Sequence, residues 1–192
     1  MSTDIDVASS ALVLMGAATI SDFDGTSTEA IVANNIYETI VEAAMTMSRW
    51  RFCTGQQDLS LLVATPSARY NFAYQTPTSP KMLLLHGITV SNNIIKYDLY
   101  ENKIYCDEGS DSTVVADYTY RSATADWPPY FKRALIYDLA SVFAGSIAQD
   151  GNLAAHYEER SSALYTQAKT IEAQSRTTKQ VRARGLINTR QR

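Results

Sequence analysis

Trp50-Arg51-Phe52-Cys53-Thr54-Gly55 marks the point at which the sequence changes character. Before this segment, apolar residues recur at intervals of three and four, which is the spacing of one face of a helix. After it, residues 55–121 are rich in Leu, Val, Ile, Tyr and Thr and are often interrupted by turn residues, as strands are. Because Trp50 and Phe52 lie between the two parts, we expect both rings to anchor the helical part against the strands, with about 150–250 Å² of each ring buried.

Two helices are predicted before this point. The first starts with Thr3 or Asp4 as its N-cap and has Gly16 at its C′ position. The second starts near Thr26, because Thr26 and Glu29 have the spacing of a capping box, in which each side chain accepts a free backbone N–H. Its apolar positions continue almost to the change of character.

Strands are predicted throughout residues 55–121, because short runs rich in β-branched and aromatic residues lie between turn residues. Glu101-Asn102 fits a two-residue hairpin turn, since Asn tolerates a positive φ. The predicted strands are Asp58–Ala64, Arg69–Gln75, Met82–Val90, Ile94–Tyr100, Lys103–Cys106 and Thr113–Tyr120.

Two more helices are predicted after the strands. Pro128 and Pro129 fit the first turn of one helix, where a missing N–H removes no hydrogen bond. Asp150-Gly151-Asn152 separates it from the other helix, which ends near Thr178. This order predicts an α+β fold, a bundle of about four helices with an inserted antiparallel β subdomain. We expect residues 1–54 and 122–178 in the bundle, 55–121 in the β subdomain, and 179–192 in an extended, basic C-terminal tail.

The composition is that of a globular protein. Apolar residues make up 45% of the 192 positions and charged residues 19%, and no apolar run approaches the roughly 18 residues of a membrane helix. We therefore expect no membrane association, and the start Met1-Ser2-Thr3-Asp4 lacks the early basic residues of a secretory signal. Cys53 and Cys106 have neither the spacing of a zinc site nor the number needed for a disulfide framework, so we expect reduced thiols, no metal and no cofactor.

The net charge of −3 is unevenly distributed. Residues 176–192 hold six of the 17 basic side chains and no acidic one, which leaves 11 basic and 20 acidic side chains in residues 1–175. A basic tail on an acidic body suggests that the tail binds an acidic partner or nucleic acid. The acidic body itself is a poor surface for duplex DNA.

Asp22-Phe23-Asp24-Gly25-Thr26 matches the first motif of haloacid-dehalogenase-type phosphatases, D-x-D-G-T. In that motif the first Asp attacks phosphorus and the second Asp protonates the leaving oxygen. The motif belongs after a buried strand in a parallel sheet, whereas here a helical pattern follows it and consecutive strands come later. We therefore interpret the segment as a polar turn between two helices, and a phosphatase that uses Asp22 and Asp24 is the third functional hypothesis.

The chain has twelve tyrosines. Tyr70, Phe72 and Tyr74 alternate along one predicted strand, and Tyr118 and Tyr120 along another. Aromatic strands can stack the bases of single-stranded nucleic acid. Because few basic residues accompany them, core or protein-interface roles are favoured. A single-stranded nucleic-acid-binding protein, which uses the tyrosines and the basic tail, is the alternative function.

Short motifs follow one another in a defined order along residues 7–172. They are Leu12-Val13-Leu14-Met15-Gly16, Ile20-Ser21-Asp22-Phe23-Asp24, Trp50-Arg51-Phe52-Cys53, Tyr70-Asn71-Phe72-Ala73-Tyr74 with Pro77, Pro80-Lys81-Met82-Leu83, and Trp127-Pro128-Pro129-Tyr130-Phe131. Their order resembles that of the tail tubular protein A family, the head-to-tail adaptors of short-tailed bacteriophages. Cys53 stands where that family usually has a small residue.

The resemblance implies a structural virion protein and not an enzyme. Such adaptors assemble in the host cytoplasm into a ring, usually of twelve copies, which joins the portal protein to the tail nozzle protein in the neck of the virion. The ring continues the channel through which genomic DNA passes without sequence-specific binding. We expect the basic tail to extend along the portal, where its arginines meet carboxylates and its apolar residues fill a groove. The expected portal-contact residues are Lys179, Arg182, Arg184, Leu186, Ile187, Arg190 and Arg192.

Overall fold

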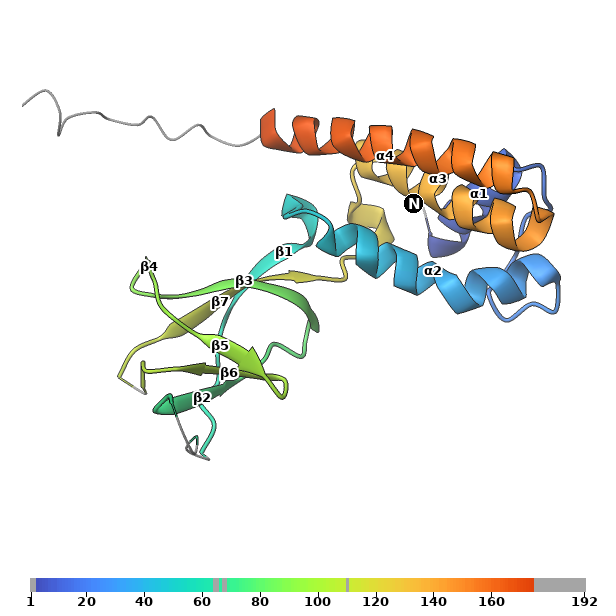
Figure 1. Ribbon diagram of the computed structural model, residues 1–192. Coiled ribbons are helices and arrows are strands. Elements are labelled where there is room, and N and C mark those ends of the chain that lie inside the picture. Colours follow the sequence, from blue (N-terminus) through green and yellow to red (C-terminus); the bar gives the residue numbers. More distant parts are fainter. Residues whose placement is uncertain (1–2, 64–65, 67–68, 110, 175–192) are drawn as a thin grey trace, which may run out of the picture.

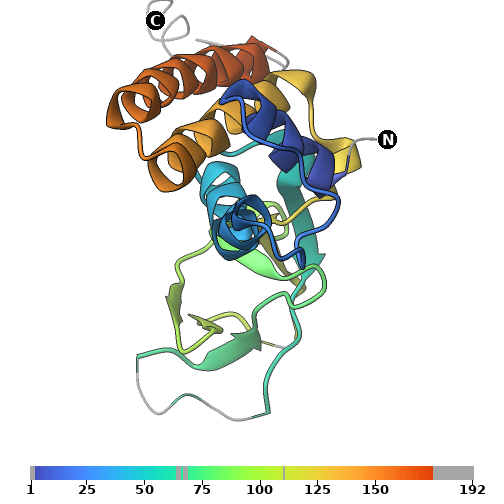
Figure 2. The ribbon, with the colours of Figure 1, turned by 90° about the vertical axis from the view of Figure 1, so that its right-hand side faces the viewer.

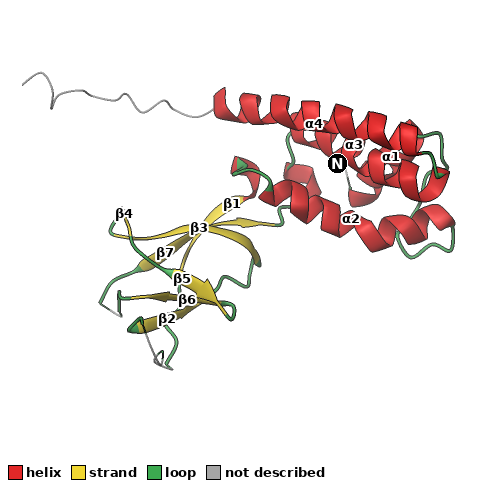
Figure 3. Ribbon diagram, viewed as in Figure 1, coloured by secondary structure: helices red, strands yellow, loops and turns green. Residues whose placement is uncertain are grey.

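The computed structural model describes residues 3–63, 66, 69–109 and 111–174. Two helices precede the strands and two follow them, so the α+β class predicted from the sequence is confirmed (Figures 1 and 3). The helices are α1 (Asp4–Leu14), α2 (Thr28–Thr46), α3 (Pro129–Phe143) and α4 (Gly151–Gln174). The strands are β1 (Thr54–Asp58), β2 (Phe72–Gln75), β3 (Met82–Val90), β4 (Asn93–Ile94), β5 (Asp98–Tyr100), β6 (Lys103–Cys106) and β7 (Val114–Tyr120).

The described strands form two antiparallel sheets. The larger has the order β1-β7-β3-β4 and the smaller the order β2-β6-β5. Tyr74 and Ile104 of the smaller sheet pack with Ile88, Val114 and Tyr118 of the larger one in a shared hydrophobic core. Each sheet therefore buries one face against the other, which gives this part of the chain a core of its own.

All four helices contribute to a second hydrophobic core. Figure 2 shows α3 and α4 side by side, with α1 next to them and α2 below. The buried side chains of this core include Leu12 of α1, Val41 and Met45 of α2, Phe131, Leu135, Leu139 and Phe143 of α3, and Leu164 and Tyr165 of α4.

Helix α1 begins and ends where the sequence predicts. The Thr3 Oγ1 accepts the Asp6 N–H at 3.2 Å, and the Asp6 carboxylate accepts the Thr3 N–H at 2.7 Å. These two bonds form a capping box. Gly16 follows the C-cap Met15 with a φ of 79°, in the left-handed region that glycine adopts without steric cost.

The predicted start of α2 is wrong by one residue. Ser27 is the N-cap, because its Oγ accepts the Ala30 N–H at 3.2 Å and the helix begins at Thr28. The Thr26–Glu29 capping box is not formed. Hydroxyl side chains occupy three consecutive positions here, and spacing alone does not select the one that turns toward the helix.

The central strands are confirmed. β3 and β6 have the predicted bounds, and β7 begins one residue later than predicted, at Val114. Glu101 and Asn102 have φ values of 52° and 56°, so the predicted hairpin turn joins β5 to β6 with both residues in the left-handed region.

The strands at the sheet edges are predicted less well. The predicted strand Asp58–Ala64 is wrong, because β1 ends at Asp58, where that strand is predicted to begin. β1 pairs with β7 from Thr54 opposite Thr119 to Asp58 opposite Val115. Leu61 forms only an isolated bridge, to Tyr74. The predicted strand Ile94–Tyr100 divides into β4 and β5, which belong to different sheets.

The positive φ of Gly16 predicts the effect of a substitution there. A Cβ on Gly16 would meet no atom within 4 Å, so Gly16→Ala tests the backbone alone. We expect it to lower the free energy of unfolding by about 1–2 kcal/mol, the cost of placing an L-residue in this region. Urea denaturation measures this loss of stability. Gly151→Ala is the control, because Gly151 is helical and a Cβ there would also meet no atom within 4 Å. Equal losses of stability in the two variants would contradict the role of the positive φ at Gly16.

Candidate functional site

Trp50 and Phe52 lie at the junction between the helices and the sheets, immediately before β1. Trp50 is fully buried, its ring lies edge-on to that of Phe131 with a centroid separation of 5.5 Å, and its Nε1 donates to the Ala44 carbonyl at 2.9 Å. Phe52 is half-buried, with its ring centroid 4.7 Å from that of Phe131. Both rings belong to the helical core, and Leu83 of β3 also packs against that core.

Arg121, directly after β7, links the larger sheet to α1 and α2. Its guanidinium donates to the Asp4 carboxylate at 3.0 Å and to both oxygens of Glu38 at 2.8 and 3.3 Å. The same group lies 4.9 Å from the ring centroid of Trp127, a cation–π distance. Three elements distant in sequence therefore meet at one cation.

Asp4 is the acidic centre of this cluster. Its carboxylate accepts hydrogen bonds from the hydroxyls of Thr124 and Tyr37 and from the Arg121 guanidinium. Burial raises the pKa of Asp4, but the hydrogen bonds from Thr124 and Arg121 outweigh burial and hold this pKa below its usual value.

Glu172, near the end of α4, is a second polar link to the junction. Although only 4% exposed, it accepts the backbone N–H of Arg51 at 2.9 Å and the hydroxyl of Tyr130. Burial, followed by the hydrogen bond to Glu172, raises the pKa of Tyr130 to about 12. Sequence reasoning missed Glu172, because a glutamate in the last turns of a polar helix gives no signal that it is buried.

The two cysteines are buried and free. Burial, with a smaller effect from Glu172, raises the pKa of the Cys53 thiol to about 12. Burial also raises the pKa of Cys106. Both thiols are therefore protonated at neutral pH, and neither has the character of a reactive cysteine.

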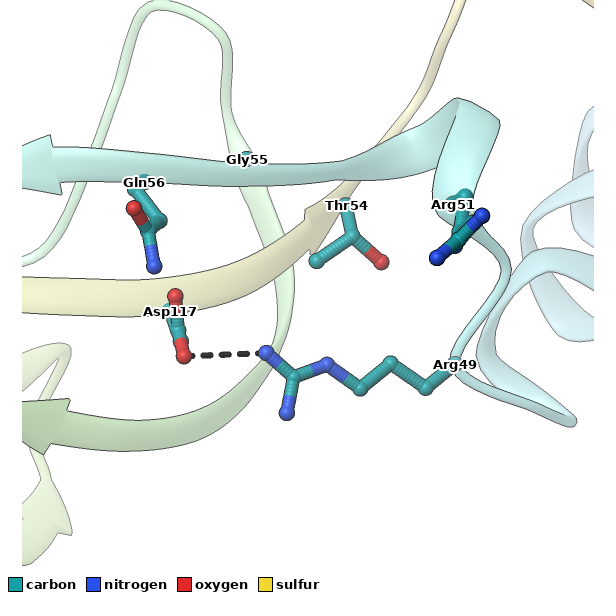
Figure 4. Close-up of a pocket in the computed structure, with 6 residues that line it drawn as sticks. All are labelled: Arg49, Arg51, Thr54, Gly55, Gln56 and Asp117. Carbon is teal, nitrogen blue, oxygen red and sulfur yellow. Dashed lines mark hydrogen bonds and ion pairs between the residues drawn. The ribbon is translucent and has the colours of Figure 1, made fainter. Parts of the chain in front are cut away.

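An open cleft of about 530 Å³ lies at the junction, between the chain that enters β1 and the neighbouring strand β7 (Figure 4). Its residues offer guanidinium, hydroxyl, amide and carboxylate groups. The Arg49 guanidinium donates to one oxygen of Asp117 at 2.9 Å, and the other Asp117 oxygen is buried with no hydrogen-bond partner among the described residues. Such a lining suits polar contacts with another molecule. The lining residues are Arg49, Arg51, Thr54, Gly55, Gln56 and Asp117.

Asp22 and Asp24 lie on the exposed loop between α1 and α2. No strand precedes them in the described chain, whose strands all pair antiparallel. The surroundings that the phosphatase motif requires are therefore not found around these two residues.

The aromatic residues considered for base stacking are mostly inside the molecule. Tyr74 and Tyr118 are each 2% exposed and belong to the core between the sheets. Their hydroxyls donate to the Glu108 carbonyl at 2.8 Å and to the Gln57 amide oxygen at 3.1 Å. Phe72 and Tyr120 pack against the same core, and Tyr70 is half-buried.

The expected portal-contact residues of the tail lie outside the described residues, since the description ends at Gln174. Among the described residues, no group of three His, Cys, Asp or Glu side chains is placed to hold a metal ion. No described helix has both the length and the apolar character needed to cross a membrane. No protein-family model and no curated protein matches the chain.

The burial of Trp50 predicts a large effect of its removal. We expect Trp50→Ala to lower the free energy of unfolding by about 3–5 kcal/mol, because it leaves a cavity next to Phe131. Chemical denaturation measures the loss. Ile94→Ala is the control, because Ile94 is 83% exposed and an exposed truncation changes stability by about 0.5 kcal/mol or less. A Trp50→Ala melt that matches the wild type would refute the assignment.

The lowered pKa of Asp4 predicts how stability depends on pH. The ionised carboxylate stabilises the folded state above the usual pKa of 3.8, and this contribution is lost as the pH falls through the lower folded-state pKa. Asp4→Asn should therefore be less stable than the wild type at neutral pH, and the difference should shrink in acid. Urea unfolding at a series of pH values measures this, with Asp24→Asn as an exposed control. A difference that does not change with pH would contradict the assignment.

Proposed function

We propose that this chain is the subunit of a head-to-tail adaptor of a short-tailed bacteriophage. One observation carries the proposal: two motifs that lie far apart in the sequence come together in space. Trp50 and Phe52 of the W-x-F motif pack against Phe131, and Trp127 lies edge-on to Phe131 with a centroid separation of 5.6 Å. The aromatic residues of these two motifs therefore form one cluster, as expected if both motifs are required by a common fold.

Three of the other motifs lie at the ends of elements, and Ile20–Asp24 lies in the loop between α1 and α2. Leu12–Gly16 closes α1, Tyr70–Tyr74 leads into β2, and Pro80–Leu83 leads into β3. Motifs at such places determine how helices and strands are joined. This supports the finer architecture that we propose for the described residues, a bundle of four helices with an inserted β subdomain.

In the proposed assembly, twelve copies of the chain form a ring between the portal protein and the tail nozzle protein in the neck of the virion. Genomic DNA passes through the ring without sequence-specific contacts. The acidic body supports this role, because 20 acidic and 11 basic side chains in residues 1–175 make it repel DNA at distances up to about 8–10 Å. The ring assembles in the host cytoplasm, and the basic tail contacts the portal.

The two other hypotheses gain less support from the geometry. A single-strand binder requires accessible aromatic faces, whereas Tyr74 and Tyr118 are buried. A phosphatase requires Asp22 after a buried strand, whereas Asp22 lies on a loop after α1.

The proposal is tested by mixing the purified chain with its portal protein, and separately with DNA over a range of salt concentrations. We expect a complex with the portal. Binding to DNA that weakens steeply with salt, without binding to the portal, would favour the single-strand binder. Phosphatase turnover that Asp22→Asn abolishes would favour the third hypothesis.

Deletion of residues 179–192, which carry five basic side chains and no acidic one, tests the role of the tail. We expect the truncated chain to keep its thermal melt and to lose portal binding, as measured by sedimentation with the portal. A tail in which Arg182, Arg184, Arg190 and Arg192 are replaced by Lys is the control that keeps the charge. Normal docking of the truncated chain would contradict the role of the tail, and normal docking with altered genome retention would favour contact with DNA.

A further inference from the structure

A groove of about 430 Å³ between α1 and α3 has apolar walls and a basic rim. Leu14 of α1 and Ile136 and Tyr137 of α3 form most of its walls, and Lys132 and Arg133 lie at its edge. Among the described residues, no carboxylate forms an ion pair with either of these two cations. In a body with an excess of acidic side chains, two cations beside an apolar groove form a distinct surface.

The groove lies on the outer side of the helical part. Ser10 and Leu14 line it, whereas Ala11 and Leu12 of the same helix face the core. Tyr157 of α4 donates from its hydroxyl to the Leu14 carbonyl at 2.6 Å. The same ring packs edge-on against Tyr137, with a centroid separation of 6.1 Å. These contacts hold one end of the groove in place, so the groove is formed before anything binds.

A complementary surface lies at the start of α2. Ile31 is 51% exposed, and Asp22 and Asp24 are exposed on the loop before the helix. The loop is folded against the first turn, because a Cβ on Gly25 would lie 3.1 Å from the Ala30 Cβ and 3.4 Å from the Asp22 Oδ1. The loop that carries the two carboxylates therefore lies against the turn of α2 that also carries the exposed Ile31. In Figure 2 the start of α2 lies below α1, away from the α3 and α4 pair.

We propose that the groove of one copy receives the acidic loop and Ile31 of a second copy. The proposal rests on the proposed adaptor function and names the contact between neighbouring subunits. Lys132 and Arg133 pair with Asp22 and Asp24, and Ile31 enters the apolar groove. The basic C-terminal tail does not suit this groove, because the two rim cations repel it.

The two surfaces are different patches of the same chain, so the contact is head-to-tail. Such a contact leaves a free groove on one end of every complex and a free loop on the other. It therefore continues from copy to copy until a ring closes, whereas a self-complementary contact stops at a dimer.

Two charge-reversed variants test the contact. The groove variant carries Lys132→Glu and Arg133→Glu, and the loop variant carries Asp22→Lys and Asp24→Lys. Each variant alone opposes like charges, so we expect its self-association to weaken at least tenfold relative to the wild type. In an equimolar mixture, the acidic groove of one variant meets the basic loop of the other, and the basic groove meets the acidic loop. We therefore expect the mixture to regain association.

Sedimentation velocity at protein concentrations up to about 1 mM measures the association. Contacts between copies with a binding free energy of about −4 kcal/mol or stronger are detected in this range. Lys96→Glu is the matched control, because Lys96 is exposed on the segment between β4 and β5, and it should associate as the wild type does. Circular dichroism melts establish that each variant is folded.

Recovery of association in the mixture, with species larger than a dimer, supports the proposal. A mixture that stays monomeric, a wild type that stays monomeric throughout this range, or association that stops at a dimer would overturn it. Portal binding is measured on the same samples. Variants that bind the portal as single copies without self-association leave the adaptor function standing, whereas a wild type that associates without binding the portal argues against that function.

Discussion

The packing of Trp50 against Phe131 is the contact on which the rest of the structure depends. Trp50 ends the connection from α2 and precedes β1, and Phe131 lies in the first turn of α3. The position of each neighbouring element therefore follows from where these two rings meet. The Trp50 indole N–H is also satisfied, by the Ala44 carbonyl at the end of α2, so the ring is buried without an unpaired donor.

Hydrogen bonds of charged side chains add to the apolar contacts at the junction between the helices and the sheets. Arg121 is bonded to carboxylates on α1 and α2, and Glu172 to a backbone N–H and a tyrosine hydroxyl. A charge removed from water is tolerated only when such partners replace the water. These partners have defined directions, so they restrict how the helices and the sheets are oriented in a way that apolar packing alone does not.

Much of the fold follows from local patterns in the sequence. The α1 caps, strand β3 and the turn at Glu101-Asn102 depend on residues close in the chain, and these were predicted. β1 was not, because Thr54–Asp58 contains no apolar run and its strand conformation comes from pairing with β7. Of the candidate site, the expectation that Trp50 and Phe52 are buried at the junction came from their position in the sequence, whereas Glu172 and the partners of Arg121 are brought together only by the folded chain.

The pairing of β1 with β7 also bears on the order of events in folding. Thr54 lies opposite Thr119, so the chain leaves the two sheets beside the place where it entered them. Without this pairing, contact between Trp50 and Phe131 would require closure of a long, flexible loop, whose entropy cost rises with its length. Once β1 and β7 are paired, only the few residues at each end of the ladder remain to be ordered. Non-local strand pairing, a slow step in most proteins, here lowers the entropic barrier to completion of the helical core.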